Sequence, residues 1–535
     1  MRIPVGRREQ LTRLSASPWW RGVAVFATGA LPVLAFPAPG LWWFAYVALV
    51  PWLLLVRTAP TGRRAVVEGW LGGTGFMLAM HHWLMPNLHV FILLIAALLG
   101  LLWAPWGWLV RSMLGGAPSP GRAAAAIAVV PSGWLMVEVV RSWEGLGGPW
   151  GLLGASQWQV PPALRLASVG GVWLVSLLVV AVNTAVVVLV AVPTARVPAV
   201  AGVCACALAV GAVWLWAPRP GRSGEDVRIA VVQPGVINGV GGADRRFARG
   251  EQLTRELAGR DVDLVVWGES SVGVDLAARP RFAARLAAVS RAVGADVLVN
   301  VDARRSDRPG IFKSSVLVGP DGPTGDRYDK MRLVPFGEYV PARALLGWAT
   351  SVGKAAGEDR MRGSRQSVMV LPDDEGRAGL RVGPLVCFES AFPDMSRRLV
   401  RSGTQLLIAQ SATSTFQDSW APAQHASLAA LRAAETGRPM VHATLTGVSA
   451  VYGPGGEPVG ERLSTGTSAS AVYEVPLAGG TTPYVRLGDW PVYGALAVLA
   501  ALCAAEGLRA LRKPAPETAA PPARTAHGSA VRPGR

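Results

Sequence analysis

Long apolar stretches constrain the fold of this chain more than any other sequence feature. They lie near residues 22–36, 40–56, 66–84, 90–110, 123–140, 167–192, 197–216 and 490–505. Each is about long enough, with some tilt, to cross a hydrocarbon core of roughly 30 Å. Because 51% of all residues are hydrophobic, the sequence predicts a multi-span α-helical membrane domain with about eight spans.

The distribution of arginine predicts the orientation of these spans. The net charge of +17 comes from 52 basic residues, of which only four are lysines. The basic residues gather in both tails and in alternate turns between the apolar stretches, which is typical of membrane topology and not of a nucleic-acid-binding surface. We therefore expect both termini in the cytoplasm and the long polar region before the last span on the extracytoplasmic face.

The sequence divides into five predicted parts. These are a basic cytoplasmic N-terminus at 1–21, a seven-span membrane domain at 22–220, an extracytoplasmic catalytic domain at 221–487, a last transmembrane helix at 488–508 and a disordered cytoplasmic tail at 509–535. The first span follows several arginines, as a secretory signal does, but no convincing cleavage site follows it. We expect it to remain as an anchor.

Reactive side chains end three apolar runs of the catalytic domain. Short apolar runs alternate there with helical patterns, which is typical of an α/β domain. Glu269, Lys330 and Cys387 each stand at the end of such a run, and strand ends present side chains from a rigid sheet. Cys387 is also the only cysteine outside the apolar stretches, so it has no partner for an internal disulfide.

These three residue types together favour acyl-transfer chemistry. A thiol attacks as thiolate, so it needs a base for its proton and a cation that favours the anion. Glu269 is the candidate base, and Lys330 is the candidate cation that also stabilises an oxyanion with backbone N–H groups after Cys387. Taken singly, Cys387 could be a small core residue, Glu269 a helix cap and Lys330 a solvated surface charge. Their joint occurrence favours the catalytic interpretation.

Three stretches resemble the apolipoprotein N-acyltransferase family: Val266 to Ser270, Tyr328 to Pro341 and Val386 to Glu389. The resemblance covers nearly the whole chain. It implies a nitrilase-like αββα sandwich, of the carbon–nitrogen hydrolase superfamily, joined to the membrane domain. It also implies a catalytic triad of Glu269, Lys330 and Cys387, with Glu338 and Glu389 at accessory acidic positions.

The resemblance further implies a reaction and its partners. Cys387 would take an acyl chain from a membrane phospholipid as a thioester. It would then pass the chain to the N-terminal amine of the diacylglyceryl-cysteine of an apolipoprotein, in the last step of lipoprotein maturation. We expect a monomer in the cytoplasmic membrane, with no cofactor, no metal and no nucleic acid as partner.

The sequence departs from the family pattern at two places. Residues 412–417 read Ala-Thr-Ser-Thr-Phe-Gln where many members have Asn-Asp-Ala-Trp-Phe-Gly, which leaves the preference for donor lipid open. Lys313 stands in a stretch that is expected to read Tyr-Asn-Ser, and we expect its side chain to meet solvent. The loop from Arg141 to Arg165 resembles the family's lipid-facing loop, but we expect its tryptophans to form an ordinary interfacial belt.

Three alternatives remain open. A membrane-anchored amidase or nitrilase would hydrolyse small C–N bonds with the same triad, although it would not need so many spans. A transporter or sensor with an inactive domain would need charges within the spans, and only Glu68 and Glu138 lie near them, at their edges. A Cys–His enzyme would use His425 or His442, but Glu269 and Lys330 already supply both roles.

Overall fold

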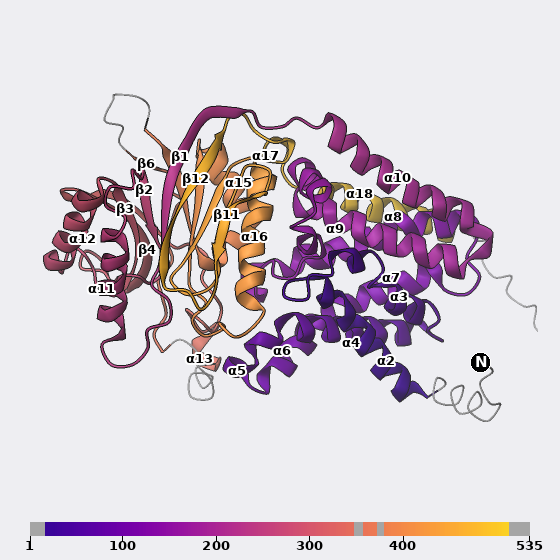
Figure 1. Cartoon of the computed structure of the whole chain (residues 1–535). Helices are drawn as coiled ribbons and strands as arrows, with labels where there is room; N and C mark the ends of the chain where they lie inside the picture. Colours follow the sequence, from indigo (N-terminus) through magenta and orange to yellow (C-terminus); the bar gives the residue numbers. More distant parts are fainter. Residues whose placement is uncertain (1–16, 347–356, 372–378, 513–535) are drawn as a thin grey trace, which may run out of the picture.

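A helical domain and a β-rich domain lie side by side in the computed structural model, which describes residues 17–346, 357–371 and 379–512 (Figure 1). The predicted basic N-terminus lies largely outside the described residues, and so does most of the predicted tail. The last helix continues to Leu511, past the predicted boundary at residue 508.

The helical domain contains five helices in the described part that are long and apolar enough to cross a membrane. They are Phe91–Leu114, Pro120–Arg141 (α8), Pro161–Ala191 (α9), Pro193–Trp216 and Trp490–Leu511 (α18). The first of these joins α6 (Phe91–Gly100), η4 (Leu101–Trp103) and α7 (Ala104–Leu114), and the fourth contains η7 (Pro193–Ala195) and α10 (Arg196–Trp216).

The first three predicted spans have a different form. They coincide with α2 (Pro18–Ala30) and η1 (Leu31–Ala35), with η2 (Trp42–Tyr46) and α3 (Val50–Arg57), and with α4 (Gly62–His81). The first two are interrupted, and α4 carries Arg63, Arg64 and Glu68 near its start. The count of about eight spans therefore stays a prediction.

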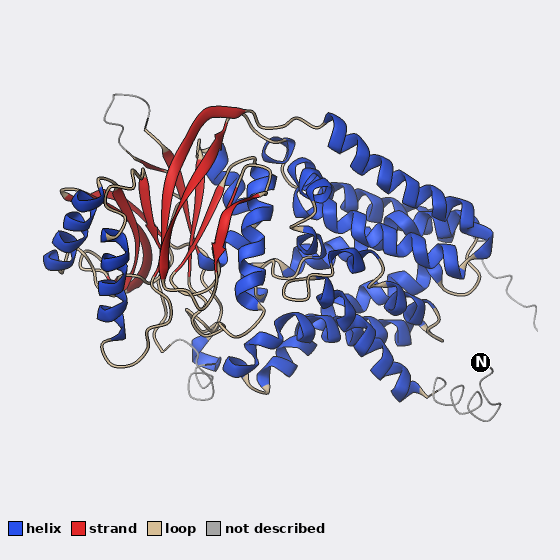
Figure 2. Cartoon of the chain, viewed as in Figure 1, coloured by secondary structure: helices blue, strands red, loops and turns tan. Residues whose placement is uncertain are grey.

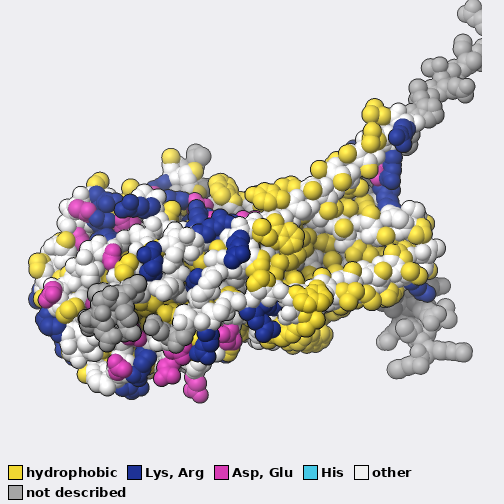
Figure 3. Space-filling view, turned by 90° about the horizontal axis from the view of Figure 1, so that it is seen from above, with side chains coloured by type: hydrophobic (Ala, Val, Ile, Leu, Met, Phe, Trp, Pro, Cys, Tyr) yellow, Lys and Arg dark blue, Asp and Glu magenta, His cyan; other side chains and the backbone are white. Residues whose placement is uncertain are grey.

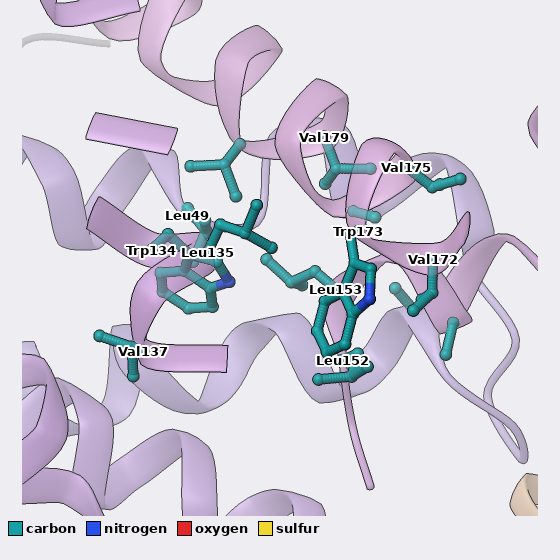
Figure 4. Packing of buried hydrophobic residues seen from close by; sticks show 14 of the residues in the cluster. Leu49, Trp134, Leu135, Val137, Leu152, Leu153, Val172, Trp173, Val175 and Val179 are labelled. Atoms are coloured by element: carbon teal, nitrogen blue, oxygen red, sulfur yellow. The ribbon is translucent and has the colours of Figure 1, made fainter. Parts of the chain in front are cut away.

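Close packing between these helices relies on glycine and tryptophan. A Cβ atom on Gly69 of α4 would lie 2.3 Å from the carbonyl oxygen of Trp103, so this contact requires glycine. The rings of Trp52, Trp103 and Trp106 surround that of Trp134 with centroid distances of 5.1 to 5.9 Å. Figure 4 shows buried side chains of α8, α9 and η6 (Leu153–Gln157) packed together nearby. Small residues and dense van der Waals contact are what hold helices together in lipid.

The outer surface of the helical domain is apolar. Val197, Leu208 and Trp216 of α10 are 81%, 73% and 78% exposed. Hydrophobic side chains cover this half of the visible face, whereas charged side chains gather on the β-rich half (Figure 3). An apolar surface of this extent is stable only against lipid or a partner, so the helical half has the character of a membrane domain.

The β-rich domain is a sandwich of two six-stranded mixed sheets. The first has the order β12-β1-β2-β3-β4-β5 and the second the order β11-β10-β9-β8-β7-β6. The strands are β1 (Arg222–Gln233), β2 (Leu264–Trp267), β3 (Asp296–Arg304), β4 (Ile311–Gly319), β5 (Gly322–Asp329), β6 (Met369–Val370), β7 (Arg381–Val386), β8 (Leu406–Ser411), β9 (Met440–Thr444), β10 (Ser449–Tyr452), β11 (Pro458–Leu463) and β12 (Ala469–Ala478). A buried apolar cluster with members from both sheets fills the space between them.

Helices cover the outer face of each sheet, which gives the αββα layering that the family resemblance implied (Figure 2). α11 (Gly242–Arg255) and α12 (Pro280–Val293) pack on the first sheet, whereas α15 (Pro393–Arg401) and α16 (Ala421–Thr436) pack on the second. α16 also contacts α9, and nearly all of its residues are buried. The β-rich domain therefore rests on the helical domain through α16.

Candidate active site

The strand β7 delivers Cys387 to a sharp turn at the start of η8 (Cys387–Ala391). Cys387 has a φ of +50°, which is unfavourable for a residue with a Cβ atom and costs roughly 1–3 kcal/mol. Such a strained turn from strand to helix lifts a nucleophile out of the backbone around it. The surrounding contacts must therefore hold it in place.

Glu389 supplies much of that restraint. Its buried carboxylate accepts hydrogen bonds from the N–H of Val386 at 2.8 Å, the N–H of Met331 at 2.7 Å and the hydroxyl of Tyr328 at 2.7 Å. Burial raises the pKa of Glu389, although the hydrogen bonds from Tyr328 and Val386 oppose the shift. The predicted accessory residue thus connects the turn of Cys387 to the segment that carries Lys330.

Two glutamates and two lysines form a closed ring next to this turn. Oε1 of Glu269 lies 3.2 Å from Nζ of Lys330 and 2.8 Å from Nζ of Lys313. Oε1 of Glu338 lies 2.7 Å and 3.2 Å from the same two nitrogens. We call these four residues the Lys–Glu ring. It brings together Glu269 after β2, Lys330 after β5, Glu338 in the next loop and Lys313 of β4.

The expectation that Lys313 meets solvent was wrong. Its side chain is only 13% exposed, and besides the two glutamates its ammonium lies 3.7 Å from Asp302. The alternation along β4 contained a signal, because Leu317 belongs to the core between the sheets and side chains two and four positions away share its face. Lys313 therefore points toward the second sheet, where the carboxylates stabilise a buried ammonium.

The surroundings favour the ionised form of Glu269 but the protonated form of Cys387. Burial alone would raise the pKa of Glu269, but Lys313 and then Lys330 overcome it and lower this pKa to about 2. Burial, together with the charge of Glu269, raises the pKa of Cys387 to about 12 despite the nearby Lys330. Burial also opposes the charge of Lys330, but Glu269 and Glu338 raise its pKa. At neutral pH the site therefore holds a thiol beside an ionised carboxylate, so the thiolate is not formed in advance.

The two histidines do not form a Cys–His pair. Nε2 of His425 lies 3.1 Å from the backbone carbonyl oxygen of Cys387, and its Nδ1 lies 3.1 Å from the hydroxyl of Ser411. Burial lowers the pKa of His425 to about 4 and that of His442 well below its usual range. His425 therefore stays neutral at pH 7 and supports the backbone of the nucleophile, without contacting its sulfur in the described structure.

Aromatic side chains from both domains meet beside the site. Trp150 donates a hydrogen bond to Gln424 of α16 at 2.9 Å, and its ring lies 5.5 Å from that of His425. Trp150 is thus held between the two domains, whereas Trp143 of the same loop is 65% exposed, and the expected interfacial belt stays a prediction. Within residues 412–417, the ring of Phe416 lies 4.9 Å from that of Trp83. This unusual segment thus contacts the helical domain.

The turn of Cys387 lies against the helical domain. A Cβ atom on Gly148 would come within 2.6 Å of the ring of Phe388 and 2.8 Å of the ring of Phe392. A groove of about 790 Å³ also reaches Phe392 and opens between the ends of α8 and α15. Its lining combines apolar and aromatic side chains with Arg332, Arg397, Arg398 and Arg401. The turn that carries the candidate nucleophile therefore lies at the boundary between the two domains.

Comparisons with known proteins match both halves of the chain. Residues 28–185 match the family described as "Apolipoprotein N-acyltransferase N-terminal domain", and residues 228–481 match the family described as "Carbon-nitrogen hydrolase". A protein named apolipoprotein N-acyltransferase from Azotobacter vinelandii is 32% identical over 505 residues, with 90% of this chain and 94% of the relative covered. One of the same name from Geobacter metallireducens is 29% identical, with 93% and 98% covered.

A comparison with solved structures adds a more distant match. An amidase of the nitrilase superfamily from Nesterenkonia has 18% sequence identity and a TM-score of 0.32, with 49% of this chain and 93% of the amidase covered.

Proposed function

This chain belongs to the apolipoprotein N-acyltransferase family, and from that membership we propose its complete reaction. It takes an acyl chain from a membrane phospholipid as a thioester on Cys387. It then transfers the chain to the α-amino group of the diacylglyceryl-cysteine at an apolipoprotein N-terminus. The observation that carries the proposal is the convergence of Glu269, Lys330 and Cys387 at the boundary with the membrane domain.

In the first half-reaction the sulfur of Cys387 attacks the ester carbonyl of the phospholipid. Glu269, which interacts directly with the thiol, accepts its proton as the S–C bond forms. The ammonium of Lys330 and the N–H of Phe388 stabilise the oxyanion. The intermediate then expels the lysophospholipid alkoxide, which takes the proton from Glu269, and the thioester remains.

In the second half-reaction the free amine of the lipoprotein attacks the thioester. Glu269 accepts a proton from the amine as the N–C bond forms, and the same donors stabilise the second oxyanion. The S–C bond breaks, the thiolate leaves, and Glu269 returns the proton to it. The products are the N-acylated lipoprotein and the original thiol, so no cofactor or metal is needed.

The arrangement of the arginine-rich turns supports a catalytic domain on the extracytoplasmic face. The side chain of Arg57 donates to the carbonyl of Leu114 at 3.1 Å, and that of Arg111 donates to the carbonyl of Ala59 at 2.7 Å. These turns therefore gather at one end of the membrane domain, whereas α10 and α18 join the catalytic domain at the other. We place the basic end in the cytoplasm and the protein, as a monomer, in the cytoplasmic membrane with multiple spans.

A reconstituted assay tests this function against the amidase alternative. The protein is placed in phospholipid vesicles with a synthetic diacylglyceryl lipopeptide, and the products are weighed by mass spectrometry. We expect a thioester on Cys387 with phospholipid alone and an N-acylated lipopeptide after the acceptor is added, with neither in Cys387→Ala. Hydrolysis of small amides without N-acylation would contradict the proposal and favour the amidase.

A further inference from the structure

Lys313 is the member of the Lys–Glu ring for which the proposed mechanism has no role. Glu269 is the base in that mechanism, and Lys330 stabilises the oxyanion. A lysine also departs from the Tyr-Asn-Ser stretch expected at residues 312–314. The chain therefore places an additional ammonium against the carboxylate that is meant to accept a proton.

The ammonium of Lys313 makes hydrogen bonds and ion pairs within the site. Nζ lies 2.8 Å from Oε1 of Glu269, 3.2 Å from Oε1 of Glu338 and 3.3 Å from the hydroxyl oxygen of Ser270. The ammonium thus donates hydrogen bonds to Glu269 and Ser270 and forms an ion pair with Glu338. Because its side chain is only 13% exposed, Lys313 is an integral part of the site.

Without Lys313 the charges around Glu269 do not balance. The single ammonium of Lys330 would then face the carboxylates of both Glu269 and Glu338, at 3.2 and 2.7 Å, while Asp302 would keep its ion pair with Arg360. Carboxylates crowded in a buried site share a proton, since like charges at close range disfavour ionisation. A shared proton on Glu269 would remove the base.

We propose that Lys313 is a positioning residue that fixes the carboxylate of Glu269 toward Cys387 and keeps it ionised in mildly acidic conditions. This inference rests on the proposed function, in which Glu269 is the base. The titratable and charged groups around Glu269 and its two lysines come from several elements: Asp302 of β3 with its partner Arg360, Lys313 of β4, Lys330 after β5, Glu338 of the following loop, Cys387 of η8 and His425 of α16.

The proposal determines the sign of a pH effect. The rate of thioester formation falls where Glu269 becomes protonated, which is the acid limb of the pH profile. Lys313 lowers the pKa of Glu269, so its removal raises this pKa and moves the acid limb to higher pH. An arginine at the same position keeps a cation beside Glu269 and restores most of the original limb.

The experiment measures single-turnover thioester formation from phospholipid vesicles between pH 5 and 8. The variants are Lys313→Asn, Lys313→Met and Lys313→Arg, and Arg327→Gln is the control, since Arg327 is another partly buried cation of the same sheet, paired with Asp329. We expect Lys313→Asn and Lys313→Met to lose at least about threefold in rate from pH 7.5 to pH 5. Lys313→Arg, the control and the original protein should show a flat rate over this range.

Each outcome has one meaning. A folded Lys313→Asn or Lys313→Met protein, checked by its melting temperature, whose acid limb is unchanged would overturn the inference. A uniform loss of rate at every pH, not rescued by arginine, would also overturn it, because that pattern indicates a structural role. Thioester formation by Cys387→Ala would instead refute the proposed function, so the two failures are distinguishable.

Discussion

Proton transfer from Cys387 to Glu269 is the decisive event of the proposed mechanism at the scale of single residues. Burial and the charge of Glu269 keep the thiol protonated, and the two lysines keep Glu269 ionised. Because the raised pKa keeps Cys387 as a thiol before substrate arrives, the proposed mechanism requires the proton to move while the carbonyl is attacked. The resting enzyme thus holds a thiol that is poorly reactive toward other electrophiles.

Glu269→Gln tests this dependence on a base. The amide keeps the size of the side chain but cannot accept the proton, so we expect thioester formation to slow by about 10²- to 10⁴-fold. Rapid-quench mass spectrometry of the phospholipid-loaded protein measures the rate. Glu256→Gln, an exposed change on the surface near α11, is the control and should react at the original rate. Equal rates in both variants would exclude Glu269 as the base.

The sequence predicted the candidate triad but not the complete ring. Glu269, Lys330 and Cys387 end apolar runs within recognisable motifs, so their types and positions suggested their roles. For Lys313 the alternation along β4 indicated only the buried face, and not its closest partner, Glu269, which is 44 residues away in the chain. A contact of that kind depends on how β2 and β4 are placed in the sheet, which local sequence does not specify.

At the scale of helices and strands, the space available to glycine limits how closely the membrane helices approach. Gly69 of α4 faces the backbone at Trp103, whereas a Cβ atom on Gly211 of α10 would meet nothing within 4 Å. A change from glycine to alanine would therefore cause a clash in α4 but none in α10.

Gly69→Ala and Gly211→Ala form a matched pair for this difference. We expect Gly69→Ala to lower the free energy of unfolding by about 1–3 kcal/mol, since the added methyl group forces α4 away from its neighbours. Gly211→Ala should change it by no more than about 0.5 kcal/mol. Titration of the micellar protein with a denaturing detergent, followed by circular dichroism, measures both. An equal loss in the two variants would argue against close packing at Gly69.

Apolar runs predicted where the long helices lie, but not where a helix is interrupted by a 3-10 segment. The predicted span at 90–110 corresponds to the helical run Phe91–Leu114, because its continuous hydrophobicity leaves few alternatives. The stretch at 22–36 is instead divided between α2 and the 3-10 segment η1, which contains Pro32. Proline removes a backbone donor, but its effect on helix type depends on tertiary contacts that the sequence does not reveal.

At the scale of the whole molecule, α16 joins the catalytic domain to the membrane domain. Glu435 of this helix accepts a hydrogen bond from the N–H of Val172 at 2.7 Å, where α9 departs from helical geometry at Gly170 and Gly171. Arg432 pairs with the same carboxylate at 2.8 Å. A single buried side chain thus closes a break in a membrane helix from the catalytic side.

Glu435→Gln tests this connection through pH. Burial raises the pKa of Glu435 to about 7, above its value in an unfolded chain, so the folded state binds the extra proton between about pH 4.5 and 7. The free energy of unfolding of the original protein should therefore fall as pH rises through this window. Glu435→Gln removes this titration, so its free energy of unfolding, measured at pH 5 and pH 7, should stay level where that of the original protein falls. A difference that is independent of pH would contradict the shifted pKa.

The almost complete burial of α16 has a consequence for how such an enzyme can evolve. One continuous apolar core includes residues of α16, of the outer face of β8 and of α9, so the two domains share their interior and do not merely touch. A substitution in α16 must suit a sheet on one side and a membrane helix on the other. A substitution at the shared core in one domain therefore requires a matching substitution in the other. A chimaera that combines the two domains of distant relatives would pack poorly where α16 meets α9.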